Sequence, residues 1–123
     1  MTDSINTLYS AILDARSKDP LESRTSKLLR EGSAKIAKKL AEEAVEVGHE
    51  AILKDAGSVV RESADVIYNL CVLWADVGIK PEDVWSEMER RVKLMGIAEK
   101  LPKPPSPYRG RKLRGNGISA AAG

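Results

Sequence analysis

Apolar residues recur at helical spacing along most of the chain. The first stripe follows the i, i+3, i+4, i+7, i+8 pattern of an amphipathic helix with one buried face. Its members are Ile5, Leu8, Tyr9, Ile12 and Leu13. No stretch of four or more residues alternates apolar and polar positions as a half-buried strand would. The pattern therefore predicts an all-α fold.

Turn and cap residues divide this pattern into five helices. Asp19-Pro20 is a break, because the residue before a proline avoids helical backbone. Gly32 suits the end of a helix and Pro81 the start of one. We expect Ser58 to cap the fourth helix after a turn at residues 55–57. The predicted helices run from about Ser4 to the break at residue 19, from Ser23 to Gly32, from Ser33 to Lys54, from Val59 to Val77 and from Pro81 to Met95.

The composition fits one globular helical domain. The chain has 123 residues, of which 42% are hydrophobic and 31% charged, as in a typical folded domain. Aromatic residues make up only 4% and Phe is absent, so the core must consist of aliphatic side chains, which favours helix packing. No apolar run approaches the length of a membrane span, and acids in the first 30 residues argue against a secretory signal.

The single cysteine and the single histidine exclude several kinds of site. Cys71 has no second cysteine in the chain with which to form a disulfide or a cysteine-based zinc site. It therefore favours a cytoplasmic protein. His49 alone offers little to a zinc site or a Ser-His-Asp mechanism. Carboxylates and lysines remain as the candidates for chemistry.

Charge divides the chain into a body and a tail. Residues 101–123 contain five basic residues and no acid, so residues 1–100 carry a net charge of −3. The same segment holds four of the six prolines and four of the nine glycines. We therefore predict an all-α domain over residues 1–100 and a flexible tail over 101–123. A role in solubility or in docking a partner protein is favoured over nucleic-acid binding.

Two of the predicted helices carry acidic ridges beside their apolar faces. At about 100° per residue, Glu43 lies at the edge of the apolar stripe of the third helix, and Glu46 lies near it. Glu62, Asp65 and Asn69 share one narrow face of the fourth helix. The rest of that helix is so apolar that we expect it to be largely buried.

The two acidic ridges are expected to face each other. A short turn makes the two helices antiparallel, and four carboxylates then surround one space. Such an oxygen-only site suits Mg²⁺ or Mn²⁺ rather than zinc, and Mg²⁺ commonly bridges protein carboxylates and phosphates. The alternatives are ordinary surface acids and a structural carboxylate network. Spacing alone leaves these alternatives open.

Three lysines precede the acids on the third helix, at Lys35, Lys38 and Lys39. Lys38 with Glu42, and Lys39 with Glu43, have the i, i+4 spacing of salt-bridged pairs on a solvated helix. That arrangement is common, and it is the favoured interpretation from spacing alone. The alternative is that some of these ammonium groups bind phosphate.

Residues 42–46 and 62–65 together form a recognisable acidic motif. They read EEAVE and ESAD and are separated by 15 residues. The motif resembles the EExxE…ExxD signature of the MazG-like superfamily of all-α nucleoside triphosphate pyrophosphohydrolases. Within that superfamily the chain is most similar to the phosphoribosyl-ATP pyrophosphatase family of histidine biosynthesis. The likeness runs from about residue 8 to residue 100, through DPLESRTSKLL, EGSAKIAKKLAEEAVEV, ESADVIYNLCVLW, PEDVW and GIAEK.

The resemblance implies a MazG-like helical bundle that is completed by a homodimer or a larger assembly. It also implies Mg²⁺-dependent hydrolysis of the α–β phosphate link of phosphoribosyl-ATP, with phosphoribosyl-AMP and pyrophosphate as products. The implied metal ligands are Glu43, Glu46, Glu62 and Asp65. The implied catalytic residues are Glu42, Glu43 and Glu46, and Glu42 either joins the ligands or orients the attacking water. The implied substrate-binding residues are Thr25, Lys27, Lys35, Lys38, Lys39, Tyr68 and Asn69.

Three positions depart from the family pattern. Asn69 stands where His is usual, Arg24 where Tyr is usual, and Ala41 where Gly is usual. Asn can donate and accept hydrogen bonds but cannot shuttle a proton as His can. These departures leave the acids intact and bear on the substrate. The alternatives are a pyrophosphatase that acts on another (d)NTP and a non-catalytic, nucleotide-binding helical dimer.

Overall fold

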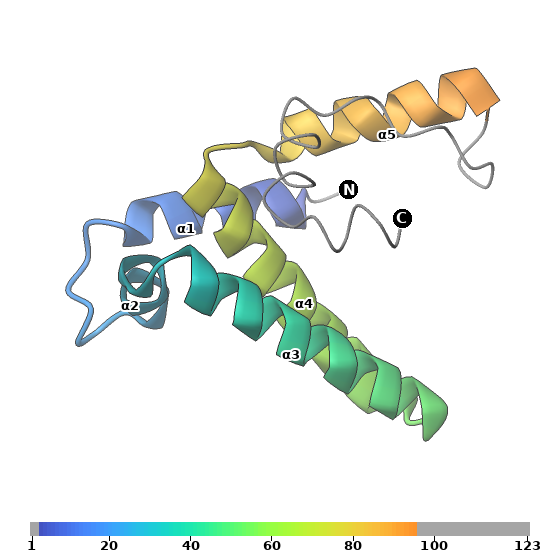
Figure 1. The fold of residues 1–123 in the computed structure, drawn as a ribbon, viewed down its shortest axis with the longest axis horizontal. Coiled ribbons are helices and arrows are strands. Elements are labelled where there is room, and N and C mark those ends of the chain that lie inside the picture. The colour runs from blue at the N-terminus through green and yellow to red at the C-terminus, as the bar shows by residue number, and fades with distance from the viewer. Residues whose placement is uncertain (1–2, 96–123) are drawn as a thin grey trace, which may run out of the picture. The chain divides into compact units, whose positions relative to one another are not determined.

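The computed structural model describes residues 3–95, in which every regular element is an α-helix (Figure 1). The helices are α1 (Ser4–Ala15), α2 (Arg24–Glu31), α3 (Ser33–Ile52), α4 (Ala56–Val77) and α5 (Pro81–Met95). The predicted all-α class is confirmed. The tail predicted for residues 101–123, and the domain boundary predicted at residue 100, lie outside the described residues. No helix in the described range is long and apolar enough to cross a membrane.

Side-chain acceptors cap the first turns of α1, α2 and α4. The Ser23 hydroxyl accepts a hydrogen bond from the backbone N–H of Ser26 at 3.1 Å, as predicted for the second helix. The prediction that Ser58 caps the fourth helix is wrong. The Asp55 carboxylate accepts both the Ser58 backbone N–H at 3.1 Å and its hydroxyl at 2.9 Å. The two oxygens of the Asp55 carboxylate can accept both donors. Asp55 is therefore the N-cap, and α4 begins at Ala56, earlier than the predicted Val59.

Two helices end earlier than the apolar pattern predicted. α1 ends at Ala15, and the chain then turns, with the Lys18 backbone N–H donating to the Ala15 carbonyl at 3.1 Å. α3 ends at Ile52, and Lys54 adopts a left-handed backbone with φ of 60°. This tight turn returns α4 alongside α3, so the two longest helices form an antiparallel pair (Figure 1).

The hydrophobic core lies at one end of the α3–α4 pair, where α1 and α2 pack on it. Its members come from α1, α2, the first turns of α3 and the second half of α4: Tyr9, Ile12, Leu28, Ile36, Cys71, Val72, Trp74 and Ala75. The Tyr9 hydroxyl donates to the Ile79 carbonyl at 2.6 Å. This compact unit ends at Glu87, and α5 continues as a regular helix to Met95.

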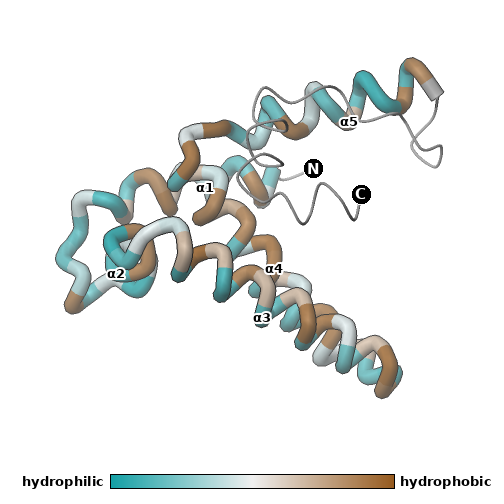
Figure 2. The backbone as a smooth tube through the Cα atoms, viewed as in Figure 1, coloured by the Kyte–Doolittle hydropathy of each residue, from teal (hydrophilic) through white to brown (hydrophobic). Residues whose placement is uncertain are grey.

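The other end of the α3–α4 pair is apolar but not buried in one chain. Ile52 is 77% exposed, Leu53 72%, Val60 69% and Val45 57%. Figure 2 shows that hydrophobic residues continue along the pair to this end. The prediction that the fourth helix is largely buried is therefore wrong for its first half, because all the buried residues of α4 lie between Asn69 and Ala75.

Candidate active site

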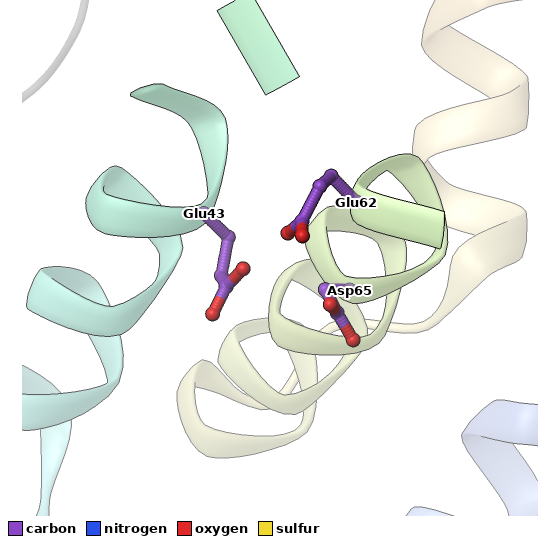
Figure 3. A group of neighbouring side chains, drawn as sticks. All are labelled: Glu43, Glu62 and Asp65. Atoms are coloured by element: carbon purple, nitrogen blue, oxygen red, sulfur yellow. The ribbon is translucent and has the colours of Figure 1, made fainter. Parts of the chain in front are cut away.

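The antiparallel pair brings carboxylates from two helices together. Glu43 projects from α3 toward Glu62 and Asp65 on α4 (Figure 3). Each of the three offers one carboxylate oxygen, and these oxygens lie within 4.8 Å of one another. Glu62 and Asp65 share a face of α4 because they are three residues apart. The predicted approach of the two acidic ridges is confirmed for these three residues.

The carboxylates in this cluster repel one another and are partly removed from water. Desolvation by burial raises the pKa of Glu62 to about 7, and the neighbouring charges of Glu46, Asp65 and Glu43 add to the effect. Desolvation also raises the pKa of Glu43, again with contributions from Glu46 and Asp65. One carboxylate oxygen each of Glu43 and Glu62 is buried without a hydrogen-bond partner. A cation among these oxygens would supply the opposite charge that the cluster lacks.

The other acids predicted for the site are placed differently. Glu46 lies one turn after Glu43 on α3, is exposed, and acts electrostatically on both Glu43 and Glu62. Glu46 therefore lies beside the cluster but is not one of its three members. Glu42 is exposed on α3 and belongs neither to the cluster nor to the cavity described next. Its predicted catalytic role stays a prediction.

A cavity of about 710 Å³ adjoins the acidic cluster and shares Glu43 and Asp65 with it. Its walls come from α2, α3 and α4: Arg24, Thr25, Lys27, Leu28, Glu31, Lys35, Lys39, Glu43, Asp65, Tyr68 and Asn69. An acidic cluster that could hold a hard cation at one edge, with basic side chains on the walls, is suited to a phosphorylated ligand.

The lysines of α3 fall into two groups. Lys35 and Lys39 are half-buried and belong to the cavity wall, one turn apart. Their position favours the interpretation that they bind phosphate over that of surface decoration. Lys38 is exposed and is not part of the wall. The structure therefore does not bring Lys38 together with the other predicted substrate-binding residues.

Helix α2 contributes part of the cavity wall. The hydroxyls of Thr25 on α2 and Tyr68 on α4 lie 2.6 Å apart in a hydrogen bond that crosses the wall. Lys27 also contributes to the wall, so Thr25, Lys27, Tyr68 and Asn69, all predicted to bind substrate, border one space. The Ser26 hydroxyl donates to the Lys18 carbonyl at 2.7 Å and fixes α2 to the preceding turn.

Sequence reasoning missed three residues of the cavity wall, Arg24, Leu28 and Glu31. They are spaced i, i+4, i+7 and therefore share one face of α2, which also includes Lys27. A helical wheel of α2 centred on Lys27 would have found them. Arg24 had been noted only as a departure from the family pattern.

The chain matches a family model described as phosphoribosyl-ATP pyrophosphohydrolase over residues 5–92. It is 55% identical over 117 residues to phosphoribosyl-ATP pyrophosphatase 2 of Rhodopseudomonas palustris. The aligned region covers 91% of this chain and 89% of the relative. It is 59% identical over 103 residues to the protein of the same name in Bradyrhizobium diazoefficiens, covering 84% and 77%. The phosphoribosyl-ATP pyrophosphatase of Rhodospirillum rubrum is 48% identical over 99 residues, covering 80% and 85%. The chain belongs to the phosphoribosyl-ATP pyrophosphohydrolase family.

Proposed function

We propose that this protein hydrolyses the α–β phosphate link of phosphoribosyl-ATP and releases phosphoribosyl-AMP and pyrophosphate. The family to which it belongs supports the substrate. The observation that carries the proposal is the cluster of three carboxylates at the edge of a cavity with basic walls. Such an arrangement can hold a nucleotide by its phosphates and place one phosphorus beside the acids.

The acids of the cluster fit a hard divalent cation, and we include Mg²⁺ in the proposal, with Mn²⁺ as a substitute. Glu43, Glu62 and Asp65 would hold the ion, and Glu46 lies beside them. The two buried, unpartnered carboxylate oxygens support this fit because only a cation or a donor can satisfy them. When bound, the ion would neutralise phosphate charge and polarise the phosphorus.

The protein's own side chains would position the reactants. Lys35 and Lys39 would bind phosphate oxygens from the α3 side of the cavity, and Lys27 would do so from α2. Exposed Glu46, beside the cluster, would orient the attacking water and accept its proton. In this arrangement most of the rate enhancement comes from positioning and from charge stabilisation.

The proposed enzyme is a homodimer in which a second copy covers the exposed end of the α3–α4 pair. The four most exposed apolar side chains of that end are each more than half exposed: Val45, Ile52, Leu53 and Val60. A single chain has no further described element to cover them, and a twofold pairing of two such helical pairs would form a four-helix bundle. We place the enzyme in the cytoplasm, which suits its single buried thiol, Cys71.

The positions of two residues are compatible with a second substrate. Arg24 and Asn69, the positions that depart from the family pattern, both belong to the cavity wall and would face the ligand. A related pyrophosphatase that acts on another (d)NTP would use the same acids with different contacts to base and ribose. The chemistry would be unchanged, and only the preferred nucleotide would differ.

Pyrophosphate release in the presence of Mg²⁺ tests the proposal. Phosphoribosyl-ATP, ATP and the four dNTPs would be compared under the same conditions. We expect phosphoribosyl-ATP to give the highest kcat/KM. A preference for another triphosphate would assign the protein to the second function, and silence with every substrate would indicate a nucleotide-binding protein instead.

A further inference from the structure

Asn69 has a hydrogen-bonding arrangement that the proposed hydrolysis does not explain. Its side chain is 4% exposed, and it belongs to the cavity wall. Its Nδ2 donates to the backbone carbonyl of Asp65, one turn earlier on α4, at 2.8 Å. Its Oδ1 is buried and has no hydrogen-bond partner.

The bond to Asp65 fixes which end of the amide is available. A carbonyl can only accept, so the amide nitrogen must point to it and the oxygen must point away. Rotating the amide by half a turn would set two acceptors against each other. Asn69 therefore presents a fixed acceptor, and a buried acceptor without a donor is costly. Asn69 borders the cavity, and none of the described residues donates to its Oδ1, so a ligand bound in the cavity is a candidate source of the missing donor.

The chemistry of a nucleotide narrows the identity of that donor. Ionised phosphate oxygens only accept hydrogen bonds, so the phosphate chain cannot satisfy Oδ1. Asn69 lies one helical turn, about 6 Å, beyond Asp65 at the acidic cluster. With the α-phosphate beside the acids and the nucleoside directed along α4 toward Asn69, the first group that carries donors is the ribose, through its hydroxyls.

We propose that Asn69 recognises the ribose attached to the α-phosphate by accepting a hydrogen bond from one of its hydroxyls, and that it thereby selects ribonucleotides over deoxyribonucleotides. The inference rests on the proposed function and adds a determinant of specificity to it. Asn69 is a binding residue in this role and takes no part in proton transfer. The fixed amide also disfavours any substrate group that presents an acceptor at the same place.

The test compares substrates and variants together. Phosphoribosyl-ATP would be compared with the forms that lack the 2′- or the 3′-hydroxyl on the adenosine ribose, using wild type, Asn69→Leu and Asn69→Ala. For wild type we expect kcat/KM to fall by roughly 10- to 100-fold when the recognised hydroxyl is missing, because the buried acceptor then has no donor. In both variants the ratio between the ribose and deoxyribose substrates should approach one.

A matched control separates recognition from folding. Ser26 is fully buried and hydrogen-bonded to Lys18, and it is not part of the cavity wall. Ser26→Ala should therefore lower stability while keeping the wild-type substrate ratio. Circular dichroism would show that each variant is helical. A wild-type ratio near one, or a ratio that both Asn69 variants retain, would overturn the inference.

Binding measurements distinguish this inference from the proposed function. Calorimetry with AMP, 2′-deoxy-AMP and 3′-deoxy-AMP needs no turnover. If wild type prefers AMP and Asn69→Leu does not, the recognition of ribose stands even where phosphoribosyl-ATP is not hydrolysed. If phosphoribosyl-ATP is hydrolysed but wild type binds the three monophosphates equally, the inference fails and the proposed function stands.

Discussion

Both halves of α4 contain apolar residues, but the two halves have different surroundings. In the second half Cys71 and Val72 are fully buried, whereas in the first half Val60 is 69% exposed. The core residues of α4 all lie in its second half, and Figure 1 shows α1 and α2 at that end of the α3–α4 pair. Apolar character alone therefore does not say whether a residue belongs to the chain's own core or to a surface that a partner covers.

The acidic cluster lies where these two halves meet. Glu62 and Asp65 come at the end of the less covered half, and Asn69 is the first buried residue of the other. This position gives the carboxylates partial burial, which raises the pKa of Glu62, together with access to the cavity. A fully packed helix would have excluded the ligand, and a fully exposed one would have left the acids in water.

The largest expected effect on stability comes from the buried half. Ile36 on α3 is fully buried, and Ile52 on the same helix is 77% exposed. Ile36→Ala should reduce the free energy of unfolding by about 2–5 kcal/mol through lost burial and a residual cavity. Ile52→Ala is the matched control, and in dilute protein its effect should stay within about 0.5 kcal/mol. Urea unfolding would measure the free energy of unfolding of both variants. Equal losses in the two variants would contradict the difference in burial between the two ends of the α3–α4 pair.

The exposed half should instead govern association. Val60→Asp places a charge on the apolar surface proposed to meet a second copy. We expect association to weaken by roughly 100-fold, because the charge would be buried without a partner. Sedimentation velocity at several protein concentrations would measure the shift from dimer to monomer. Asp14 is an exposed residue of α1, and Asp14→Asn should leave association unchanged. A wild type that is monomeric at every concentration would refute the proposed dimer.

A third prediction concerns pH in the absence of divalent metal. The pKa of Glu62 rises from 4.5 in the unfolded chain to about 7 in the folded protein, so the folded state binds more protons between these values. The contribution of Glu62 to stability should therefore be fully present below about pH 4.5 and be lost as the pH rises through about 7. Glu62→Gln should flatten that slope, and thermal unfolding across this range would detect the change. An identical slope in the variant would show that Glu62 does not cause it.

The smallest expected effect comes from the bond across the cavity wall. Tyr68→Phe removes the hydroxyl that lies 2.6 Å from the Thr25 hydroxyl. The loss of one neutral hydrogen bond should raise KM by roughly 3- to 10-fold and leave kcat nearly unchanged. Steady-state kinetics would separate the two constants. A large fall in kcat would instead give Tyr68 a role in the chemical step.

Much of this architecture could be predicted from the sequence. Periodicity gave the five helices, and the turn after α3 gave the antiparallel pair that joins Glu43 to Glu62 and Asp65. The cap of α4 was misassigned because Asp55 and Ser58 are both good capping residues, and only the folded backbone shows which one is the acceptor.

Other features depend on tertiary packing and could not be predicted from the sequence. The predicted site treated Lys35, Lys38 and Lys39 alike, but only Lys35 and Lys39 border the cavity. Arg24 was overlooked as a wall residue, although a helical wheel of α2 places it on the same face as Lys27. The fixed amide of Asn69 depends on one hydrogen bond with Asp65, which spacing allows but does not require.

The central claim is that the acidic cluster enables hydrolysis of phosphoribosyl-ATP. The most direct test measures pyrophosphate release from phosphoribosyl-ATP with Mg²⁺ by wild type, Asp65→Asn and the exposed control Asp14→Asn. We predict that wild type and the control release pyrophosphate at equal rates, and that Asp65→Asn is slower by about 100-fold or more while remaining helical. Equal rates in all three proteins would contradict the account.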